Sequence, residues 1–117
     1  MGMIDVGDKP IVRREAVAAG RIVLRSSTIE VVRRRGVRKG DPFAVAEVAA
    51  MTAAKQTYLL IPHCHQIALD LVEVVFDMDD TGILATCRVV AQARTGVEME
   101  AIVAVSSALN TLWDMLK

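Results

Sequence analysis

Aromatic side chains are nearly absent from this sequence, which holds one Trp, one Tyr and two Phe among 117 residues. Proteins that bind single-stranded nucleic acid stack bases on aromatic side chains that lie beside basic ones. No aromatic residue interleaves with the basic run of Arg33, Arg34, Arg35, Arg38 and Lys39. We therefore expect no nucleic-acid partner. RNA binding through the arginines stays open as an alternative, and a steeply salt-dependent affinity would be its signature.

Net charge, a secretory leader and a long apolar run are also missing. The 14 basic and 14 acidic side chains cancel, so no global field attracts a nucleic acid or an anionic membrane. No uncharged apolar stretch approaches the ~18 residues of a membrane span. Residues 1–10 contain neither the basic nor the apolar region of a signal peptide, and only two cysteines occur. These absences predict a protein without a membrane partner in the reducing cytoplasm.

The apolar content is high, because hydrophobic residues make up 53% of the chain while charged residues make up 24%. At this length we expect one domain, residues 1–117, with a substantial core. Apolar surface beyond what the core needs predicts contacts between subunits.

Local patterns predict the first elements. Val12–Leu24 carries β-branched residues in loose alternation and predicts a strand. Ser26 or Ser27 is expected to cap a short helix over Thr28–Arg35, which Gly36 ends.

A second helix is expected from Asp41 and Pro42 to about Leu60, where Pro62 follows. Asp accepts hydrogen bonds from the free amides of a first helical turn, and Pro fits the first helical position. The many alanines of this helix permit close packing.

Two strands and a last helix follow. Leu71–Met78 and Ile83–Ala93 flank a turn at Asp79–Gly82, which predicts a hairpin. The order strand, helix, helix, strand, strand, helix predicts an α+β sandwich with helices on one face of an antiparallel sheet.

The last helix is expected from about Arg94 to Lys117, and it carries titratable groups at both ends but no charge from Ala101 to Leu112. At 100° per residue, one stripe collects Glu100, Ser107, Thr111 and Asp114, with Asn110 and Lys117 at its margin. A solvated helix face would also explain this stripe, and a capping box of Thr95 and Glu98 would explain the first acid. Asp114 and Lys117 are three residues apart and can therefore form an ion pair.

His63, Cys64 and His65 form a second candidate cluster after Pro62. We expect no metal here, because alternate residues of an extended segment point in opposite directions and no further Cys or His pair completes four ligands. His65 is either a structural histidine or a group that binds substrate or carries a proton.

The basic run is either a solvated helix end or an anion site. Gly40 and Asp41 lead into the start of the next helix, where exposed amides favour phosphate. Arg13, Arg14 and Lys55 are expected to add positive charge to such a site.

Together these segments resemble the MoaC family, the cyclic pyranopterin monophosphate synthases. The resemblance covers nearly the whole chain and depends on the order and spacing of many short matches. These are Ile4 to Val6, Arg14 to Ala16, Lys39 to Asp41, Ala53 to Lys55, Leu60 to Pro62 with Cys64 and His65, Arg94 to Ala101, and Asp114, Met115 and Lys117.

The resemblance implies a ferredoxin-like fold, assembled as a homohexamer of three dimers. It also implies a phosphorus–oxygen lyase that needs no redox cofactor. A cyclised dihydro-GTP, 3',8-cyclo-7,8-dihydro-GTP, would be rearranged to cyclic pyranopterin monophosphate, and pyrophosphate would be released.

Site roles follow from the resemblance position by position. Asp114, Lys117 and Lys39 would be catalytic. The remaining positions would bind substrate: His63, Cys64, His65, Glu98, Met99, Glu100, Arg14 and Lys55. Glu100 would support the pterin end, and Arg14 and Lys55 would bind phosphate.

The length of the last helix has a geometric consequence. At ~1.5 Å per residue, Glu100 and Asp114 lie about 21 Å apart along one helix, too far to serve one reacting centre. We therefore expect a pocket composed from two subunits. The alternative is a non-catalytic nucleotide-binding or assembly protein on the same fold.

Overall fold

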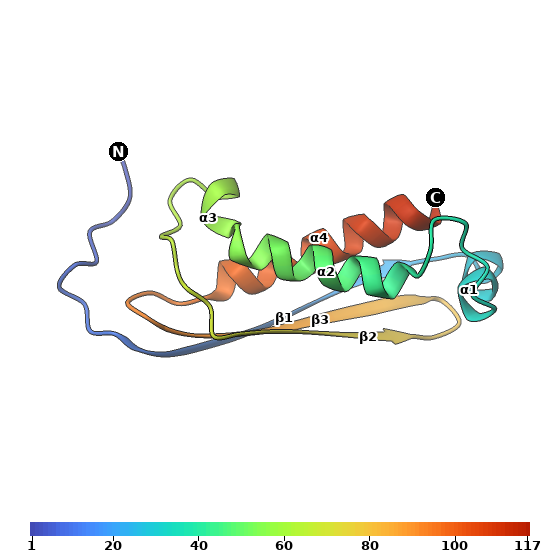
Figure 1. Cartoon of the computed structure of the whole chain (residues 1–117), viewed down its shortest axis with the longest axis horizontal. Helices are drawn as coiled ribbons and strands as arrows, with labels where there is room; N and C mark the ends of the chain where they lie inside the picture. Colours follow the sequence, from blue (N-terminus) through green and yellow to red (C-terminus); the bar gives the residue numbers. More distant parts are fainter.

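The computed structural model describes residues 1–117, which form an elongated body of 53 × 26 × 20 Å (Figure 1). Two long helices lie side by side on one face of a three-stranded sheet, and a short helix closes one end. The elements are β1 (Val12–Val23), α1 (Ser26–Arg33), α2 (Pro42–Lys55), α3 (Thr57–Leu60), β2 (Leu71–Met78), β3 (Gly82–Ala93) and α4 (Glu98–Leu116).

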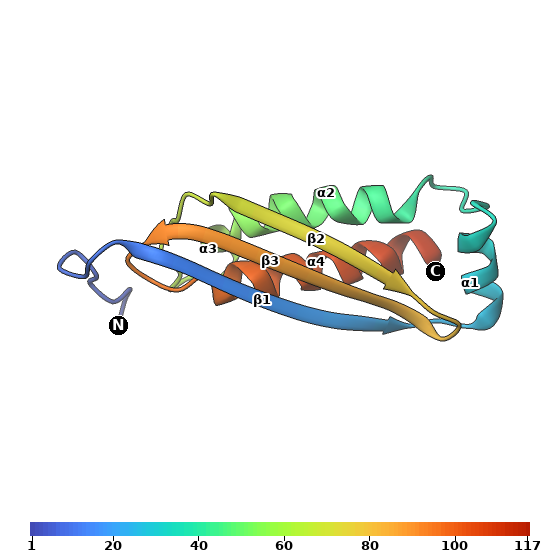
Figure 2. The same cartoon turned by 90° about the horizontal axis from the view of Figure 1, so that it is seen from below.

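The sheet is antiparallel and has the strand order β1-β3-β2. β3 is the central strand, and its pairing with β1 runs from Val12 opposite Ala93 to Val23 opposite Gly82. Figure 2 shows α2 and α4 on one face of this sheet and no helix on the other. The predicted α+β sandwich with helices on one face of an antiparallel sheet is therefore confirmed.

The core lies between the sheet and the two long helices. Ile83, Ala85, Cys87, Val89 and Ala91 alternate along β3 and are fully buried. The helices contribute small side chains: Ala46, Ala50 and Ala54 of α2, and Ala101, Ala104 and Ala108 of α4. Such side chains let helices and sheet approach closely, which explains how this alanine-rich sequence fills its interior.

The other sheet face is partly polar. Glu15 accepts hydrogen bonds from Arg88 at 2.6 Å and from Arg13 at 2.9 Å. The bond from Arg88, helped by Arg13, lowers the pKa of Glu15. Val17 and Val75 are exposed on the same face, so it combines ion pairs with apolar side chains.

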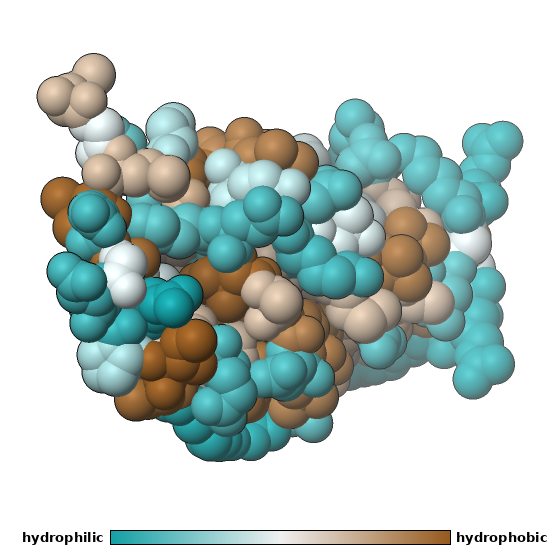
Figure 3. All heavy atoms as spheres, turned by 60° about the vertical axis from the view of Figure 1, so that its left-hand side comes forward, coloured by the Kyte–Doolittle hydropathy of each residue, from teal (hydrophilic) through white to brown (hydrophobic).

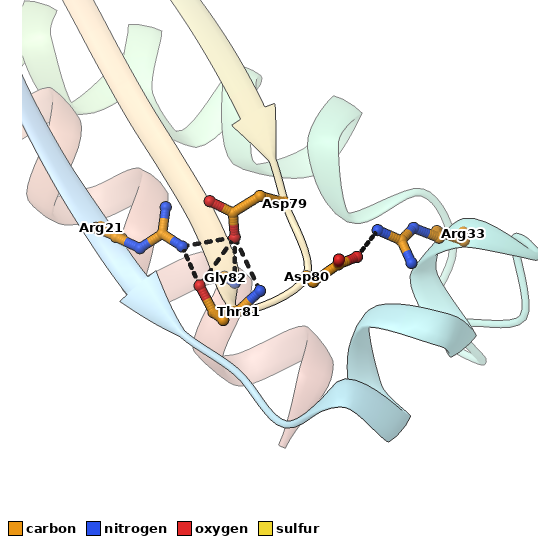
Figure 4. Close-up of polar contacts among 6 residues, drawn as sticks. All are labelled: Arg21, Arg33, Asp79, Asp80, Thr81 and Gly82. Atoms are coloured by element: carbon orange, nitrogen blue, oxygen red, sulfur yellow. Dashed lines mark hydrogen bonds and ion pairs between the residues drawn. The ribbon is translucent and has the colours of Figure 1, made fainter.

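The hairpin turn is held by one carboxylate (Figure 4). Asp79 Oδ1 accepts hydrogen bonds from Thr81 N at 2.8 Å, Gly82 N at 3.1 Å and the Arg21 guanidinium of β1 at 2.6 Å. Asp80 pairs with Arg33 at the end of α1. The turn is thereby fixed to both β1 and α1.

Three details of the helices differ from the predictions. α1 is capped by neither serine, because Ser26 is already helical and Arg25 is the N-cap. Its C-terminal left-handed residue is Arg35, with φ 57°, rather than Gly36. The helix expected to reach Leu60 breaks at Gln56, where φ −109° and ψ 12° leave the helical region before α3 begins.

The start of α2 is as predicted. Asp41 is the N-cap, and its Oδ1 accepts hydrogen bonds from Phe43 N at 3.0 Å and Ala44 N at 3.3 Å, with Pro42 at the first helical position. None of the helices has both the length and the apolar character needed to cross a membrane.

Candidate active site

Lys39, Asp114 and Lys117, which we call the lysine–aspartate cluster, come together at the C-terminal end of α4. Lys117 Nζ lies 3.2 Å from Asp114 Oδ1, and Lys39 Nζ lies 3.5 Å from Asp114 Oδ2. Lys39 Nζ also donates a hydrogen bond to the Asp114 carbonyl oxygen at 2.6 Å. Two ammonium groups that are 78 positions apart in the sequence thus share one carboxylate.

Two local features place these side chains. Asp114 and Lys117 are one helical turn apart at the end of α4, so their side chains lie on the same side of the helix. Lys39 precedes Gly40, whose φ of +116° is strained for any residue with a Cβ. The Asp41 cap then fixes this turn to the start of α2.

The two lysines control the ionisation of Asp114. The hydrogen bond from Lys117 and the charge of Lys39 lower the pKa of the Asp114 carboxyl group. Asp114 therefore remains a carboxylate at neutral pH and holds both ammonium groups in position.

A basic hollow of about 750 Å³ opens beside this cluster. It lies between α1 and the end of α4, and Arg34, Arg38, Lys39 and Lys117 line it. This concentration of cations suits an anionic ligand. The arginines were expected to be either a solvated helix end or an anion site, and the structure places two of them beside the lysine–aspartate cluster.

Six predicted substrate-binding residues meet at the other end of α4. His63, Cys64, His65, Glu98, Met99 and Glu100, which we call the histidine–glutamate cluster, all line one hollow of about 320 Å³. The first three come from the loop after α3, and the last three from the first turn of α4. Figure 3 brings this end of the molecule forward and shows hydrophobic surface interspersed with hydrophilic surface.

Glu100 is the buried acid of this cluster, with an exposed fraction of 4%. Burial raises the pKa of its carboxyl group, and the neighbouring Glu98 charge adds to the effect. Burial and the same two carboxylates raise the pKa of the Cys64 thiol. Glu100 is thus suited to hold a proton, and Cys64 is not an activated nucleophile.

The structure separates the two alternative explanations of the α4 acids. A solvated face does not explain Glu100, which is buried, whereas Asn110, Asp114 and Lys117 of the same stripe are exposed. The N-cap of α4 is Val97 with no side-chain cap, so Thr95 and Glu98 do not form the predicted capping box.

The N-terminal arm completes this end, a role that was not predicted from the sequence. His65 Nε2 lies 2.7 Å from the carbonyl oxygen of Ile4, and Ile4, Val6 and Lys9 line the hollow of the histidine–glutamate cluster. A bond between residues 61 positions apart leaves no periodic signal in the sequence.

Arg14 and Lys55 lie outside both clusters. The Arg14 guanidinium donates hydrogen bonds to the carbonyl oxygens of Ala93, at 3.4 Å, and Arg94, at 3.1 Å. Lys55 is exposed at the end of α2. Neither residue lines the 750 Å³ or the 320 Å³ hollow within one chain.

Comparisons with known proteins support one family. The sequence pattern of the MoaC family matches residues 3–117. A probable cyclic pyranopterin monophosphate synthase accessory protein of Methanothermobacter thermautotrophicus is 50% identical over 98% of this chain and 72% of its own. The chain belongs to the MoaC family. The resemblance found in the sequence is thereby confirmed.

Two further relatives match over the same share of this chain. Probable cyclic pyranopterin monophosphate synthases of Sulfolobus acidocaldarius and Thermococcus kodakarensis are 48% and 49% identical over 98% of this MoaC-family chain, and the match spans 80% and 74% of their lengths.

The two clusters of this MoaC-family chain lie at opposite ends of the molecule. Figure 1 shows the start of α4 beside the loop after α3 and the N-terminal arm, whereas its end lies beside the loop before α2. The ~21 Å between Glu100 and Asp114 along α4 separates them within one chain. No group of three or more His, Cys, Asp or Glu side chains is arranged to hold a metal.

Proposed function

We propose that this chain is a cyclic pyranopterin monophosphate synthase that converts the cyclised dihydro-GTP to cyclic pyranopterin monophosphate and pyrophosphate. The observation that carries the proposal is the meeting of Lys39, Asp114 and Lys117 in one ion-paired cluster. Names of relatives 48% and 49% identical over nearly the whole chain support the same activity.

The lysine–aspartate cluster is proposed to carry the proton transfers. Opening the purine and closing the pterin require protons to leave one atom and reach another, which positioned acid and base groups accelerate. The Asp114 carboxylate orients the Lys39 and Lys117 ammonium groups, which lie 3.5 and 3.2 Å from its oxygens. An ammonium group that gives a proton to the substrate becomes an amine, and this amine can accept the next proton, while the other ammonium group stays paired with the carboxylate.

Phosphate chemistry is proposed to use the surrounding cations. Forming the cyclic phosphate joins a sugar oxygen to the first phosphorus of the triphosphate and breaks its bond to the leaving pyrophosphate. Charge grows on the leaving oxygens, and fixed cations stabilise it. Arg14 and Lys55 are the proposed phosphate ligands, and they would reach the substrate from a neighbouring subunit.

The histidine–glutamate cluster is proposed to bind the purine and pterin end of the substrate. His63, Cys64 and His65 supply donors and a small half-buried thiol, and Glu98 and Met99 form the other wall. Glu100 lies buried beside them, and this burial raises the pKa of its carboxyl group.

A complete site needs two chains in this proposal. One subunit gives its lysine–aspartate cluster and a neighbour gives its histidine–glutamate cluster, within a homohexamer of three dimers. The cytoplasm is the proposed compartment, where the free thiols of Cys64 and Cys87 stay reduced.

Incubation with 3',8-cyclo-7,8-dihydro-GTP tests the function. The purified protein should release pyrophosphate and form a pterin that fluoresces after oxidation. Lys39→Ala should lower kcat by about 10²–10⁴ because a proton-transfer group is lost. Glu47→Ala, a change of an exposed α2 side chain, is the control and should retain activity. An inactive native protein, or an active Lys39→Ala variant, would contradict the proposal.

The second candidate is a non-catalytic nucleotide-binding or assembly protein, and the name of the Methanothermobacter relative as an accessory protein favours it. This candidate predicts saturable binding of the same nucleotide without pyrophosphate release.

A further inference from the structure

The basic hollow of about 750 Å³ beside the lysine–aspartate cluster contains more positive charge than the chain neutralises. Four of its eleven lining residues are basic, and none is acidic: Arg34, Arg38, Lys39 and Lys117 are the cations. Only the Asp114 carboxylate pairs with them, and the two lysines share it. Four cations and one carboxylate leave three positive charges. The hollow is therefore suited to an anion with several negative charges.

The two arginines of the hollow lack the partners that other arginines of the chain have. Ion pairs with carboxylates are formed by Arg13, Arg21, Arg33 and Arg88. Arg34 and Arg38 form no ion pair with any carboxylate. A guanidinium group donates two parallel hydrogen bonds to phosphate oxygens, and these two groups are free to do so.

The end of α1 sends neighbouring arginines to different partners. Arg33 pairs with Asp80 of the hairpin turn (Figure 4). The next residue, Arg34, lines the hollow instead. A Cβ built on Gly36 would lie 3.0 Å from Arg34 Nε and 3.4 Å from Arg34 Cγ, so this side chain lies against a glycine that also lines the hollow. The Arg34 guanidinium is thus placed at the hollow and not at the hairpin.

The turn that follows α1 brings Arg38 back to the same hollow. Arg35 N donates a hydrogen bond to Val32 O at 3.0 Å, and Gly36 N donates one to Val31 O at 2.9 Å. With Arg35 in the left-handed region at φ 57°, these two bonds form a Schellman motif. The motif ends the helix and reverses the chain, so that Arg38 also lines the hollow.

The charge of the hollow matches two linked phosphate groups better than one. A phosphate monoester carries about 1.5–2 negative charges near neutral pH, which neutralises only part of the three positive charges. Two linked phosphate groups carry roughly three negative charges. Ser27 and Thr28 also line the hollow, and their hydroxyl groups can donate to further phosphate oxygens.

The proposed reaction releases an anion of this kind. A sugar hydroxyl oxygen bonds to the first phosphorus, and its proton passes to a basic group of the lysine–aspartate cluster. The bond from this phosphorus to the bridging oxygen breaks, and its electron pair stays on the leaving pyrophosphate. Cations beside that oxygen stabilise the charge that grows on it.

We infer that Arg34 and Arg38 bind the pyrophosphate part of the substrate and hold the pyrophosphate after the bond breaks. Both arginines belong to the same chain as the lysine–aspartate cluster that they adjoin. The identity of the substrate rests on the proposed function, whereas the diphosphate site is a property of the hollow itself.

Titration calorimetry of the purified protein with inorganic pyrophosphate tests the site without any turnover. Arg34→Ala and Arg38→Ala should each raise the Kd of pyrophosphate about tenfold, because a charge-assisted hydrogen bond is lost. Arg34→Lys keeps the charge but loses the two parallel donors, so its Kd should rise less. Orthophosphate should bind the native protein at least about tenfold more weakly than pyrophosphate does.

Arg35→Gly is the matched control. It removes one positive charge from the same run, but Arg35 does not line the hollow, and glycine suits its left-handed conformation. Pyrophosphate binding should be unchanged in this variant. An equal loss in Arg35→Gly and Arg34→Ala would show that only the summed charge matters and would overturn the inference.

Two other results would also overturn it. Pyrophosphate and orthophosphate that bind equally well would show a site for a single phosphate group. Single-stranded RNA that displaces pyrophosphate, and that binds more weakly to Arg35→Gly as well as to Arg34→Ala, would assign the arginine run to nucleic acid.

Kinetics separate this inference from the proposed function. Added pyrophosphate should inhibit formation of the fluorescent pterin in competition with the cyclised dihydro-GTP, and Arg34→Ala should raise its inhibition constant about tenfold. Arginine-dependent binding of pyrophosphate by a native protein that forms no pterin would refute the function and leave the site standing. An active protein whose KM and inhibition constant are the same with both arginines replaced by alanine would refute the site and leave the function standing.

Discussion

Gly82→Ala should destabilise the protein strongly, because a methyl group does not fit at the start of β3. A Cβ built on Gly82 meets the Ile22 carbonyl oxygen at 2.1 Å, and that oxygen belongs to the backbone of the paired strand β1. Real Cβ atoms essentially never come within 3.0 Å of another heavy atom. The turn and the end of β1 must therefore move apart.

The cost follows from the hydrogen bonds that this movement stretches. Asp79 N donates to Gly82 O at 3.0 Å, Gly82 N to Asp79 Oδ1 at 3.1 Å, and Leu24 N to Thr81 O at 2.9 Å. Weakening three bonds of about 0.5–1.5 kcal/mol each predicts a loss of about 2–4 kcal/mol. At this chain length the melting temperature should fall by roughly 10–20 °C.

Thermal unfolding followed by circular dichroism measures this effect, with Gly2→Ala as the matched control. A Cβ at Gly2 meets nothing within 4 Å, so that variant should stay within about 0.5 kcal/mol of the native protein. If Gly82→Ala melts at the same temperature as Gly2→Ala, the close approach of β1 and the turn does not restrict position 82 to glycine.

Three further predictions concern stability. Glu100→Gln should raise the melting temperature at pH 7. Folding raises the pKa of Glu100, so the free energy of unfolding of the native protein falls as the pH rises above the pKa that Glu100 has in the unfolded chain. The gain from Glu100→Gln should vanish near pH 4, and an equal gain at both pH values would contradict this prediction. Asp41→Ala should cost about 1 kcal/mol in denaturant unfolding because Phe43 N and Ala44 N lose their acceptor, whereas Asp41→Asn should cost less. Leu112→Ala should cost about 3–5 kcal/mol, since the side chain is fully buried, and a loss below 1 kcal/mol would show that α4 is loosely packed.

Much of the fold could be predicted because local patterns agreed with the tertiary structure. The hairpin turn, the alternation of β3 and the Asp41 cap each act over a few residues, and the structure has all three. The break at Gln56 could not be predicted, because no Gly or Pro marks it. There Thr57 Oγ1 donates to Ala53 O at 2.9 Å inside the core, and this buried contact has no local signature.

The candidate site was predictable in its parts but not in its arrangement. The spacing of Asp114 and Lys117 predicted their ion pair, and the resemblance supplied Lys39. The hydrogen bond of His65 to Ile4 joins distant segments, and nothing in the sequence places the N-terminal arm there. The separation of the two clusters followed from helix length alone, since the rise per residue of a helix is constant.

Subunit complementation tests the composite site most directly. Lys117→Ala and Glu100→Ala remove one group from each cluster, so each pure variant should fail to release pyrophosphate from the cyclised dihydro-GTP. After the two variants are mixed and exchange is verified by mass spectrometry, half of the dimers contain one site with both groups intact. We expect recovery of roughly a quarter of the native activity. No recovery in fully exchanged dimers would show that the two clusters do not serve one reaction site.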